Sequence, residues 1–336
     1  MKGMILAAGF GTRLRPVTYT MPKPMVPLCN QPLIGWAAES LIDAGIRELI
    51  VNLHHLPAAI EQYLPSEFPD AEFHFSFEDE ILGTGGGIRK VRSQLERDVD
   101  FFLVNGDTVQ FPHYGELRAA RHRADALAAL TLRHPPAGDH FTAVWYNRGR
   151  VTGFGEGTGE ALMFSGSHLI SSRVFAYLPV TEFSSIVDEV YRPMIESERE
   201  VLAAIVDDGV WFDIGTPQRY ITASRALLDL MRRGVVQPRG GSRIVDGSLL
   251  HETAKGTVEQ SVVGARSVVE GSVRDSVIWD NCHIGPDVTL DGCIVAHNVE
   301  ITGPLSYSHA MICRNDRAIP PKPEHRIEND LVIVSI

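Results

Sequence analysis

The sequence predicts an α/β domain built on a mixed, mainly parallel sheet, followed by a smaller parallel β-helix. Short apolar runs alternate with amphipathic helical segments through the first part of the chain, as in sheets covered by helices. Glycines and carboxylates follow several of these runs, where ligands bind in such sheets. From about Val235 the helical patterns stop and short β-branched segments take over. We therefore expect residues 1–234 to form one domain and residues 235–336 another.

The first elements alternate strictly between strand and helix. The run Met4 to Ala8 is apolar and stops at a glycine, as buried parallel strands do. A helix is expected over 34–44, then a strand over 48–53, a short helix over 58–64 and a strand over 71–77. This order predicts a sheet covered on both faces, with the loop after the first strand at its carboxyl edge.

The next elements continue this pattern with less regularity. The run 101–107 is the clearest buried strand and ends in Gly106 and Asp107. The remaining predicted strands span 126–133, 141–146, 151–154, 163–170, 201–205 and 211–213. The remaining predicted helices span 114–124, 184–195 and 217–233, the last opened by Pro217.

The last part of the chain predicts stacked coils. Apolar residues recur six apart, in the pairs Val262 and Val268, Ile284 and Leu290, and Val288 and Ile294. A hexapeptide period is typical of a β-helix, although the spacing slips between these pairs. An irregular β-sandwich is the alternative. The terminal run 331–334 is expected to be a strand, with no signal for its partner.

Composition restricts the class of protein. Among 336 residues, 44% are hydrophobic and 22% charged, which favours an ordinary globular chain. A net charge of -11 without a basic block argues against nucleic acid as a partner. The four cysteines are widely spread and form no CxxC pair, which favours reduced thiols and a cytoplasmic protein. No apolar run approaches membrane-spanning length.

The loop after the first strand predicts a polyphosphate site. Gly9 and Gly11 allow the backbone to turn sharply and approach a ligand. Thr12, Arg13, Arg15 and Lys23 add a hydroxyl and three cations, and backbone N–H groups beside cations suit phosphates. We therefore expect a nucleoside triphosphate here.

Two strand ends and a second glycine-rich stretch extend this site. The stretch 78–87 runs into a helical pattern, which indicates either a capping turn or a second backbone surface for nucleotide or sugar. Asp107 and Asp213 each stand at a strand end, where a carboxylate caps a helix or binds a metal. Beside a phosphate loop, we expect the carboxylate oxygens to hold Mg²⁺.

These motifs resemble one family. Gly9-x-Gly11-Thr12-Arg13-x-x-Pro16-x-Thr18 with Pro22-Lys23-Pro24 is similar to the signature of sugar-1-phosphate nucleotidyltransferases. The stretches 82–87, 105–107 and 211–217 follow in the family's order. The resemblance implies a Rossmann-like, GT-A-like α/β fold followed by a left-handed β-helix. It also implies the reaction of a nucleoside triphosphate with a sugar 1-phosphate, giving a nucleotide sugar and pyrophosphate.

The resemblance assigns roles to individual residues. Arg13, Lys23, Asp107 and Asp213 would be catalytic, with Asp107 and Asp213 as the Mg²⁺ ligands. The nucleotide would contact Ala8, Gly9, Gly11, Thr12, Arg13, Glu78, Gly85 and Gly106. The sugar phosphate would lie near Glu156 and Gly166.

One departure from the family concerns the sugar phosphate. Many members grip it with a lysine in a Glu-Lys-Pro element, whereas this chain keeps Glu156 in Phe154-Gly155-Glu156-Gly157-Thr158 and lacks the lysine. This resembles branches that transfer uridylyl to N-acetylmuramate 1-phosphate or guanylyl to mannose or heptose 1-phosphate. We favour GTP and mannose 1-phosphate, because the β-helix is common in that group. UTP with a hexose or N-acetylmuramate 1-phosphate is the alternative.

Other classes of protein fit less well. An NAD-binding fingerprint would need a third glycine where Leu14 stands, and no Walker GK[ST] sequence occurs. A non-catalytic relative that binds sugar nucleotides remains open because of the missing lysine. His283, His297 and His309 could serve an acyltransferase, but each has a turn-like polar context, which favours solvated surface histidines. We expect the β-helix to serve assembly or regulation, with a homo-oligomer formed through its coils.

Overall fold

A computed structural model describes residues 1–136, 138, 141–252 and 254–336, in two compact units. Unit 1 comprises Met1–Gly9 and Ile34–Phe212, and unit 2 comprises Phe10–Leu33 and Asp213–Ile336. The domain boundary at residue 234 stays a prediction. The units divide the chain differently, because residues 10–33 group with residues 213–336 in unit 2.

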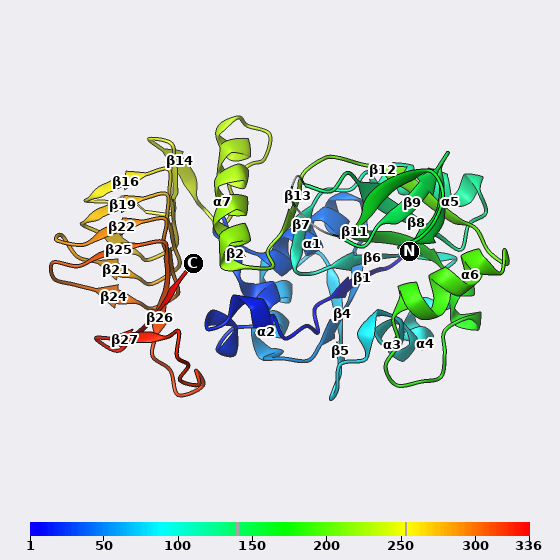
Figure 1. The fold of residues 1–336 in the computed structure, drawn as a ribbon, viewed down its shortest axis with the longest axis horizontal. Helices are drawn as coiled ribbons and strands as arrows, with labels where there is room; N and C mark the ends of the chain where they lie inside the picture. Colours follow the sequence, from blue (N-terminus) through cyan, green and yellow to red (C-terminus); the bar gives the residue numbers. More distant parts are fainter. Residues whose placement is uncertain (137, 139–140, 253) are drawn as a thin grey trace. The chain divides into compact units, whose positions relative to one another are not determined.

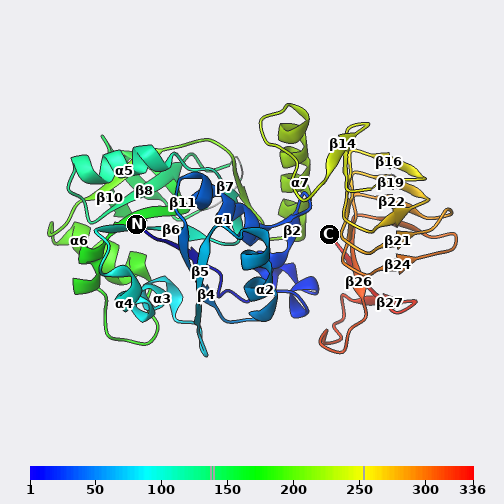
Figure 2. The same cartoon turned by 180° about the vertical axis from the view of Figure 1, so that it is seen from behind.

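Unit 1 is built on a nine-stranded mixed sheet of order β5-β4-β1-β6-β11-β8-β12-β10-β9 (Figures 1 and 2). Strands β5, β4, β1 and β6 are parallel neighbours, and β12 is parallel to β8. Strand β11 runs antiparallel to β6, β8 and β9, and β10 runs antiparallel to β12 and β9. The strands are β1 (Gly3–Leu6), β4 (Glu48–Leu53), β5 (Glu72–Phe77), β6 (Asp100–Asn105), β8 (Ala128–Arg133), β9 (Val144–Asn147), β10 (Arg150–Phe154), β11 (Glu160–Ser171) and β12 (Leu202–Val206). The predicted α/β fold is confirmed.

Helices cover both faces of this sheet, as the sequence predicts. On β1, Met4 packs in a cluster with Ile88 of α3, whereas Gly3 faces Leu41 of α1. Alternate residues of a strand point to opposite faces, so α1 and α3 lie on opposite sides. The helices are α1 (Leu33–Asp43), α2 (Ala58–Glu67), α3 (Gly83–Lys90), α4 (Arg92–Leu95), α5 (Tyr114–Arg123), α6 (Arg192–Glu196), the 3₁₀ turn η4 (Ser172–Ala176) and the π-turn η5 (Val187–Tyr191).

Two predicted elements differ from the structure. The glycines of the second glycine-rich stretch lie inside α3, because Gly83–Lys90 is helical throughout. The helix predicted over 184–195 is present over residues 186–196, but most of its first half is the π-helix η5, and α-helix α6 follows it directly. A π-turn has an i→i+5 hydrogen-bond pattern that sequence periodicity does not reveal. Two short strands, β7 (Thr108–Gln110) and β13 (Trp211–Asp213), pair outside the main sheet.

Unit 2 begins with three short turns and a hairpin. These are η1 (Thr12–Leu14), η2 (Val17–Tyr19), η3 (Lys23–Met25), β2 (Pro27–Leu28) and β3 (Gln31–Pro32). Helix α7 (Pro217–Arg232) follows β13, capped by the Thr216 side chain, which accepts the Arg219 N–H. Its buried face includes Tyr220, Leu227 and Leu228. The predicted helix start at Pro217 is confirmed.

The rest of unit 2 consists of stacked coils of short parallel strands, as expected for a β-helix (Figure 1). Its first sheet has the order β14-β15-β17-β20-β23-β26-β28-β27, its second β16-β19-β22-β25 and its third β18-β21-β24. Successive coil strands step from one sheet to the next. Val262 pairs with Val277, and Val277 with Ile294, so the coils are 15 and then 17 residues long. This is shorter than three hexapeptides and explains why the sixfold spacing slips.

The strands of the coils are brief. They are β14 (Arg243–Val245), β15 (Ser248–Leu250), β16 (Thr257–Glu259), β17 (Val262–Val263), β18 (Val268–Val269), β19 (Ser272–Arg274), β20 (Val277–Ile278), β21 (His283–Ile284), β22 (Thr289–Asp291), β23 (Ile294–Val295), β24 (Glu300–Ile301), β25 (Ser306–Ser308), β26 (Ala310–Arg314), β27 (Arg326–Glu328) and β28 (Leu331–Ser335). The terminal strand β28 pairs antiparallel with β26, a partner the sequence does not indicate. None of the helices described here combines the length and hydrophobicity needed to cross a membrane.

Candidate functional site

In unit 1, polar residues gather where parallel strands end. Strand β1 lies between β4 and β6, and Leu6 pairs with Asn52 on one side and Asn105 on the other. The chain therefore leaves β1 towards Ala8 and Gly9 at the edge where β6 leads into Gly106 and Asp107. This confirms that Asp107 follows a strand beside the first one.

Glu78 is the buried centre of a network at this edge. It lies just beyond β5 and is only 4% exposed. Its Oε1 accepts a hydrogen bond from Asn52 Nδ2 at 2.8 Å, and its Oε2 accepts the Leu82 N–H at 2.9 Å. Asn52 Oδ1 in turn accepts the Ala7 N–H at 2.8 Å. Glu78 thus fixes the end of β1 through Asn52, a residue that the sequence analysis missed.

Asn52 carries the same signal as Asp107, a polar residue at the end of an apolar strand. Its side chain bridges two strands because an amide can accept through oxygen and donate through nitrogen at once. A second polar strand end therefore contributes to the same edge.

Glycines in unit 1 allow chain segments to approach each other closely. A Cβ at Gly106 would lie 2.9 Å from the Leu6 carbonyl oxygen. A Cβ at Gly85 would lie 2.6 Å from Ser184 Oγ, and the Gly85 N–H donates to the Ser184 carbonyl at 2.8 Å. Gly166, at φ +99°, sits in an irregular part of β11 against the Asn105 side chain. Packing within the chain accounts for these three glycines, and their contacts with a substrate stay predictions.

Glu156 lines a cavity of about 380 Å³ in unit 1. The lining residues are Thr152, Gly153, Phe154, Gly155, Glu156, Arg192, Ile195 and Glu196. The Arg192 guanidinium donates to the Phe154 carbonyl, pairs with Asp188 at 3.1 Å and lies 5.9 Å from the centre of the Phe154 ring. Arg192 therefore brings a cation to the cavity that contains Glu156.

Arg192 was missed because nothing in its sequence context distinguishes it from other surface arginines. It follows the π-turn η5, whose last residue Tyr191 is fully buried and bonded to His168 Nδ1 at 2.9 Å. Burial lowers the pKa of His168 to about 3, so this imidazole is neutral near pH 7. A buried neutral pair thus fixes the turn immediately before Arg192.

In unit 2, the signature loop folds back on itself. Gly11 has a φ of +62°, in the left-handed region that favours glycine. The Gly11 carbonyl accepts the Thr18 hydroxyl at 2.9 Å, and a Cβ at Gly11 would lie 2.6 Å from Lys23 Cβ. Lys23 is 6% exposed. The structure thus brings Gly11, Thr18 and Lys23 of the motif together.

Unit 2 also brings the first motif to the last one. A Cβ at Gly215 would lie 3.0 Å from both Arg13 Nη1 and Asp213 Oδ2, so Arg13 and Asp213 lie beside Gly215. Asp213 pairs with Arg219, another residue that the sequence analysis missed. Its only sequence signal is its place in the first turn of α7, close after the aspartate. Arg13 and Asp213 are 200 positions apart in sequence and adjacent in this unit.

The predicted residues are thus divided between the two units. Unit 1 holds Ala8, Gly9, Glu78, Gly85, Gly106, Asp107, Glu156 and Gly166, and unit 2 holds Gly11, Thr12, Arg13, Lys23 and Asp213. Within the described part of the chain, no group of three or more His, Cys, Asp or Glu side chains is arranged to hold a metal. A site with two protein carboxylates is compatible with this, since Mg²⁺ keeps waters and substrate phosphates as its other ligands.

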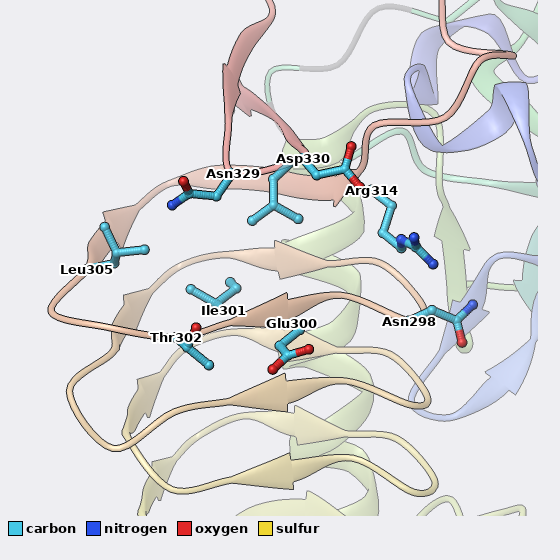
Figure 3. A pocket seen from close by; sticks show the side chains of 9 residues that line it. Asn298, Glu300, Ile301, Thr302, Leu305, Arg314, Asn329 and Asp330 are labelled. Carbon is cyan, nitrogen blue, oxygen red and sulfur yellow. The ribbon is translucent and has the colours of Figure 1, made fainter.

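A second cavity, of about 460 Å³, lies in the last coils of unit 2 (Figure 3). Figure 3 shows Glu300, Ile301 and Thr302 on one coil and Asn329, Asp330 and Arg314 beyond it. Among the described residues that line it, none belongs to the predicted catalytic set. This cavity mixes one cation with two carboxylates and is separate from the candidate site.

Comparison with known proteins identifies the family. The family model described as nucleotidyl transferase matches residues 2–229. A probable mannose-1-phosphate guanylyltransferase 3 of Oryza sativa subsp. japonica is 30% identical over 90% of this chain and 80% of its own. Mannose-1-phosphate guanylyltransferase 1 of Arabidopsis thaliana is 29% identical over the same shares.

A solved structure shows the same fold. HddC from Yersinia pseudotuberculosis, crystallised with GMP-PN, aligns with a TM-score of 0.56 at 24% identity, over 67% of this chain and 99% of its own. At this identity the likeness concerns the fold alone. Because the family model covers more than half of the chain and joins its first motif to its last, the chain belongs to the nucleotidyl transferase family.

Proposed function

We propose that the protein transfers a nucleotidyl group from a nucleoside triphosphate to a sugar 1-phosphate, with GTP and mannose 1-phosphate as the preferred pair. The observation that carries the proposal is the packing of Arg13 beside Gly215 and Asp213, which joins both ends of the family signature. The names of the relatives, mannose-1-phosphate guanylyltransferases matched over 90% of the chain, support the choice of substrates.

Nucleotidyl transfer to a sugar 1-phosphate needs no general base, which fits the candidate site residues, since none of them is assigned that role. A phosphate monoester has a second pKa of about 6, so a sugar 1-phosphate is mostly a dianion near pH 7. One of its oxygens attacks the α-phosphorus in line. A new P–O bond forms as the bond from the α-phosphorus to the bridging oxygen breaks, and pyrophosphate leaves with that electron pair. The enzyme must therefore align two polyanions and neutralise their charge.

The cations of unit 2 suit the triphosphate in this proposal. The Gly11 and Thr12 backbone and the Arg13 side chain hold it, while Lys23 contacts the reacting phosphates. Lys23 is largely buried, and its Cβ packs against Gly11. Preorganised charges at a reaction site stabilise the transition state by about 3 kcal/mol in comparable sites.

Asp107 and Asp213 are the proposed ligands of a divalent metal, which we propose to be Mg²⁺. Asp213 pairs with Arg219 through Oδ2, and a carboxylate has acceptor capacity on both oxygens, so this pair is compatible with a cation. When bound, the metal supplies positive charge against the α-phosphate and the departing pyrophosphate. EDTA should stop product formation and Mg²⁺ should restore it, whereas full activity in chelator would refute a metal role.

The remaining residues are proposed to select base and sugar. Ala8, Gly9, Glu78, Gly85 and Gly106 lie at or near the strand-end edge of unit 1 and would contact the base and ribose. Glu156 and Gly166 would contact the sugar. Arg192 supplies the cation that the missing lysine would have provided, since it lines the same cavity as Glu156.

The decisive experiment is a panel of nucleoside triphosphates and sugar 1-phosphates assayed for pyrophosphate release. Release with GTP and mannose 1-phosphate at the highest kcat/KM supports the proposal. Preference for UTP with a hexose or N-acetylmuramate 1-phosphate would keep the reaction and change the substrates. Binding of nucleotide sugars without any release would indicate a regulatory relative.

Three further properties are part of this proposal. We propose a cytoplasmic location, supported by four cysteines that are free and buried. We propose that the coils wind left-handed, supported by the hexapeptide spacing of apolar residues in their sequence. We propose a homo-oligomer formed through the coils, which light scattering of the full chain tests directly, since a monomeric mass would refute it.

A further inference from the structure

The hairpin β2–β3 follows directly after η3, the turn that carries Lys23. Its two-residue turn is formed by Cys29 and Asn30, whose φ angles are 48° and 64°. Two successive left-handed residues are typical of the tight turns that join antiparallel strands. The hairpin therefore has a defined shape and fixes the chain on either side of it.

A buried relay connects this hairpin to the coils. The Tyr220 hydroxyl of α7 donates to the Pro27 carbonyl oxygen at 2.5 Å and accepts a hydrogen bond from Trp279 Nε1 at 2.8 Å. Tyr220 is 1% exposed and Trp279 is 3% exposed. A tyrosine hydroxyl can donate and accept at once, so one hydroxyl joins the hairpin and the coil through α7.

The tip of the hairpin is attached to the coils as well. Asn30 Nδ2 donates to the Val263 carbonyl and to Ser242 Oγ, both at 2.9 Å. Val263 lies on β17, in the same sheet as β20, the strand directly before Trp279. The hairpin is thus held to one face of the coils at its base and at its tip.

The attachment continues to Lys23 through the backbone. The Val26 N–H donates to the Lys23 carbonyl at 3.0 Å, and Val26 accepts from Leu33 at 3.1 Å at the base of the hairpin. Lys23 in turn packs against Gly11. A displacement of Pro27 would therefore move Lys23 relative to Gly11.

We propose that Trp279 and Tyr220 are positioning residues for Lys23, so that the coil region acts in the reaction by holding the signature loop in shape. This inference rests on the proposed function in one respect, the contact of Lys23 with the reacting phosphates. It gives the coils a role in the reaction cycle that does not depend on oligomerisation.

The first test uses conservative variants of the full chain. Trp279→Phe replaces the indole by a smaller phenyl ring and removes the N–H donor, whereas Tyr220→Phe keeps its ring and removes only the hydroxyl. The matched control is Tyr307→Phe, which removes a hydroxyl bonded to Glu328 elsewhere in the coils. We expect the first two variants to lower kcat by about tenfold, as one well-placed hydrogen bond does, with the KM for sugar 1-phosphate unchanged.

The outcome has to distinguish positioning from general loss of stability. A matching tenfold loss in Tyr307→Phe, or an equal rise in both KM values with kcat unchanged, would overturn the proposal. In a Lys23→Met background, Tyr220→Phe should lower kcat little further, because the Tyr220 hydroxyl acts through the same lysine. A further tenfold loss in that background would also overturn it.

The second test needs no substrate. Hydrogen exchange of backbone amides in residues 10–33 should become about tenfold faster in Trp279→Phe and in Tyr220→Phe, and stay unchanged in Tyr307→Phe. If the wild-type protein releases no pyrophosphate with any substrate pair, the proposed function fails. Hydrogen exchange still decides whether Tyr220 and Trp279 anchor residues 10–33. Unchanged exchange in both variants would refute that anchoring.

Discussion

The sheet of unit 1 and the coils of unit 2 are both built from parallel strands, but they use their strand ends differently. Asn52 lies near the end of β4 and Asp107 just after β6, at an edge of the sheet where no repeat of these strands is stacked. In the coils, the N–H of Ser276 is accepted by Ser261 Oγ at 3.0 Å, and the N–H of Cys293 by Ser276 Oγ at 2.9 Å. A polar side chain at a strand end is available for chemistry only where it is not already hydrogen-bonded to the next coil.

Two histidines of the coils are likewise engaged by neighbouring coils. His283 pairs with Glu270 at 3.3 Å and with Glu300 at 3.6 Å. The His297 ring lies 5.0 Å from the Trp279 ring, and burial lowers its pKa. Both side chains are engaged in contacts between neighbouring coils, which favours a structural role for them and gives no support to acyltransferase chemistry.

Asp107→Asn should produce the largest effect. Asparagine keeps the shape and removes the charge proposed to hold the metal, so kcat should fall at least about a hundredfold. Pyrophosphate release measures this, with the melting temperature as the check on folding. Asp70→Asn, an exposed aspartate of unit 1, should leave kcat unchanged. Wild-type turnover by Asp107→Asn would mean that this strand end is as inert as those of the coils.

Arg192→Ala should have the next largest effect, on sugar phosphate alone. Loss of one guanidinium contact to a phosphate should raise the KM for sugar 1-phosphate by about tenfold or more. The KM for the nucleoside triphosphate should change little. Steady-state kinetics with each substrate varied in turn measures both, and Arg173→Ala, an exposed arginine of unit 1, is the control. Equal changes in the two KM values would contradict a role specific to the Glu156 cavity.

Ser276→Ala should affect stability and leave activity alone. The change leaves the Cys293 N–H buried without its acceptor, at a cost of about 1–3 kcal/mol in the free energy of unfolding. Urea denaturation measures this, and pyrophosphate release should stay at the wild-type rate. A loss of activity without a loss of stability would break the distinction between the two kinds of strand end.

The last prediction concerns the pH dependence of stability and His168. Its pKa is lowered to about 3 in the folded protein by burial, against about 6.5 when unfolded. Below about pH 6.5 the unfolded state binds a proton that the folded state does not, so stability falls as the pH drops towards 3. His168→Gln should flatten this dependence in urea midpoints between pH 7 and 4.5.

Tyr191→Phe is the matched variant for that experiment. It removes the hydroxyl bonded to His168 and keeps the buried imidazole. Its stability should be lower throughout, with the wild-type dependence on pH retained. An unchanged pH dependence in His168→Gln would contradict the assignment of this titration to the buried pair.

The sequence predicts the elements whose signal is local. Strand β4 has the predicted bounds 48–53, and α7 begins at Pro217 as predicted, because strand burial and helix starts depend on neighbouring residues. Asp107 could be found in the same way, from its place after a buried run. These predictions needed no knowledge of distant contacts.

The missed features depend on contacts between distant parts of the chain. The glycines of α3 lie within a helix in which Gly85 packs against Ser184, a residue far away in sequence. Arg192 reaches the Glu156 cavity through a π-turn that no periodicity indicates. The packing of residues 10–33 with the coils likewise depends on side chains such as Tyr220, which carry no motif.

The division of the chain into two compact units has a consequence for exchanging parts between related enzymes. A chimera joined at residue 234 would separate Tyr220 from Trp279 and Asn30 from Val263. Its new C-terminal region would meet a hairpin shaped for another surface. The unit that would have to be exchanged is discontinuous in sequence, since it comprises residues 10–33 and 213–336. A single crossover therefore cannot combine the substrate preference of one enzyme with the coil region of another unless the hairpin is redesigned.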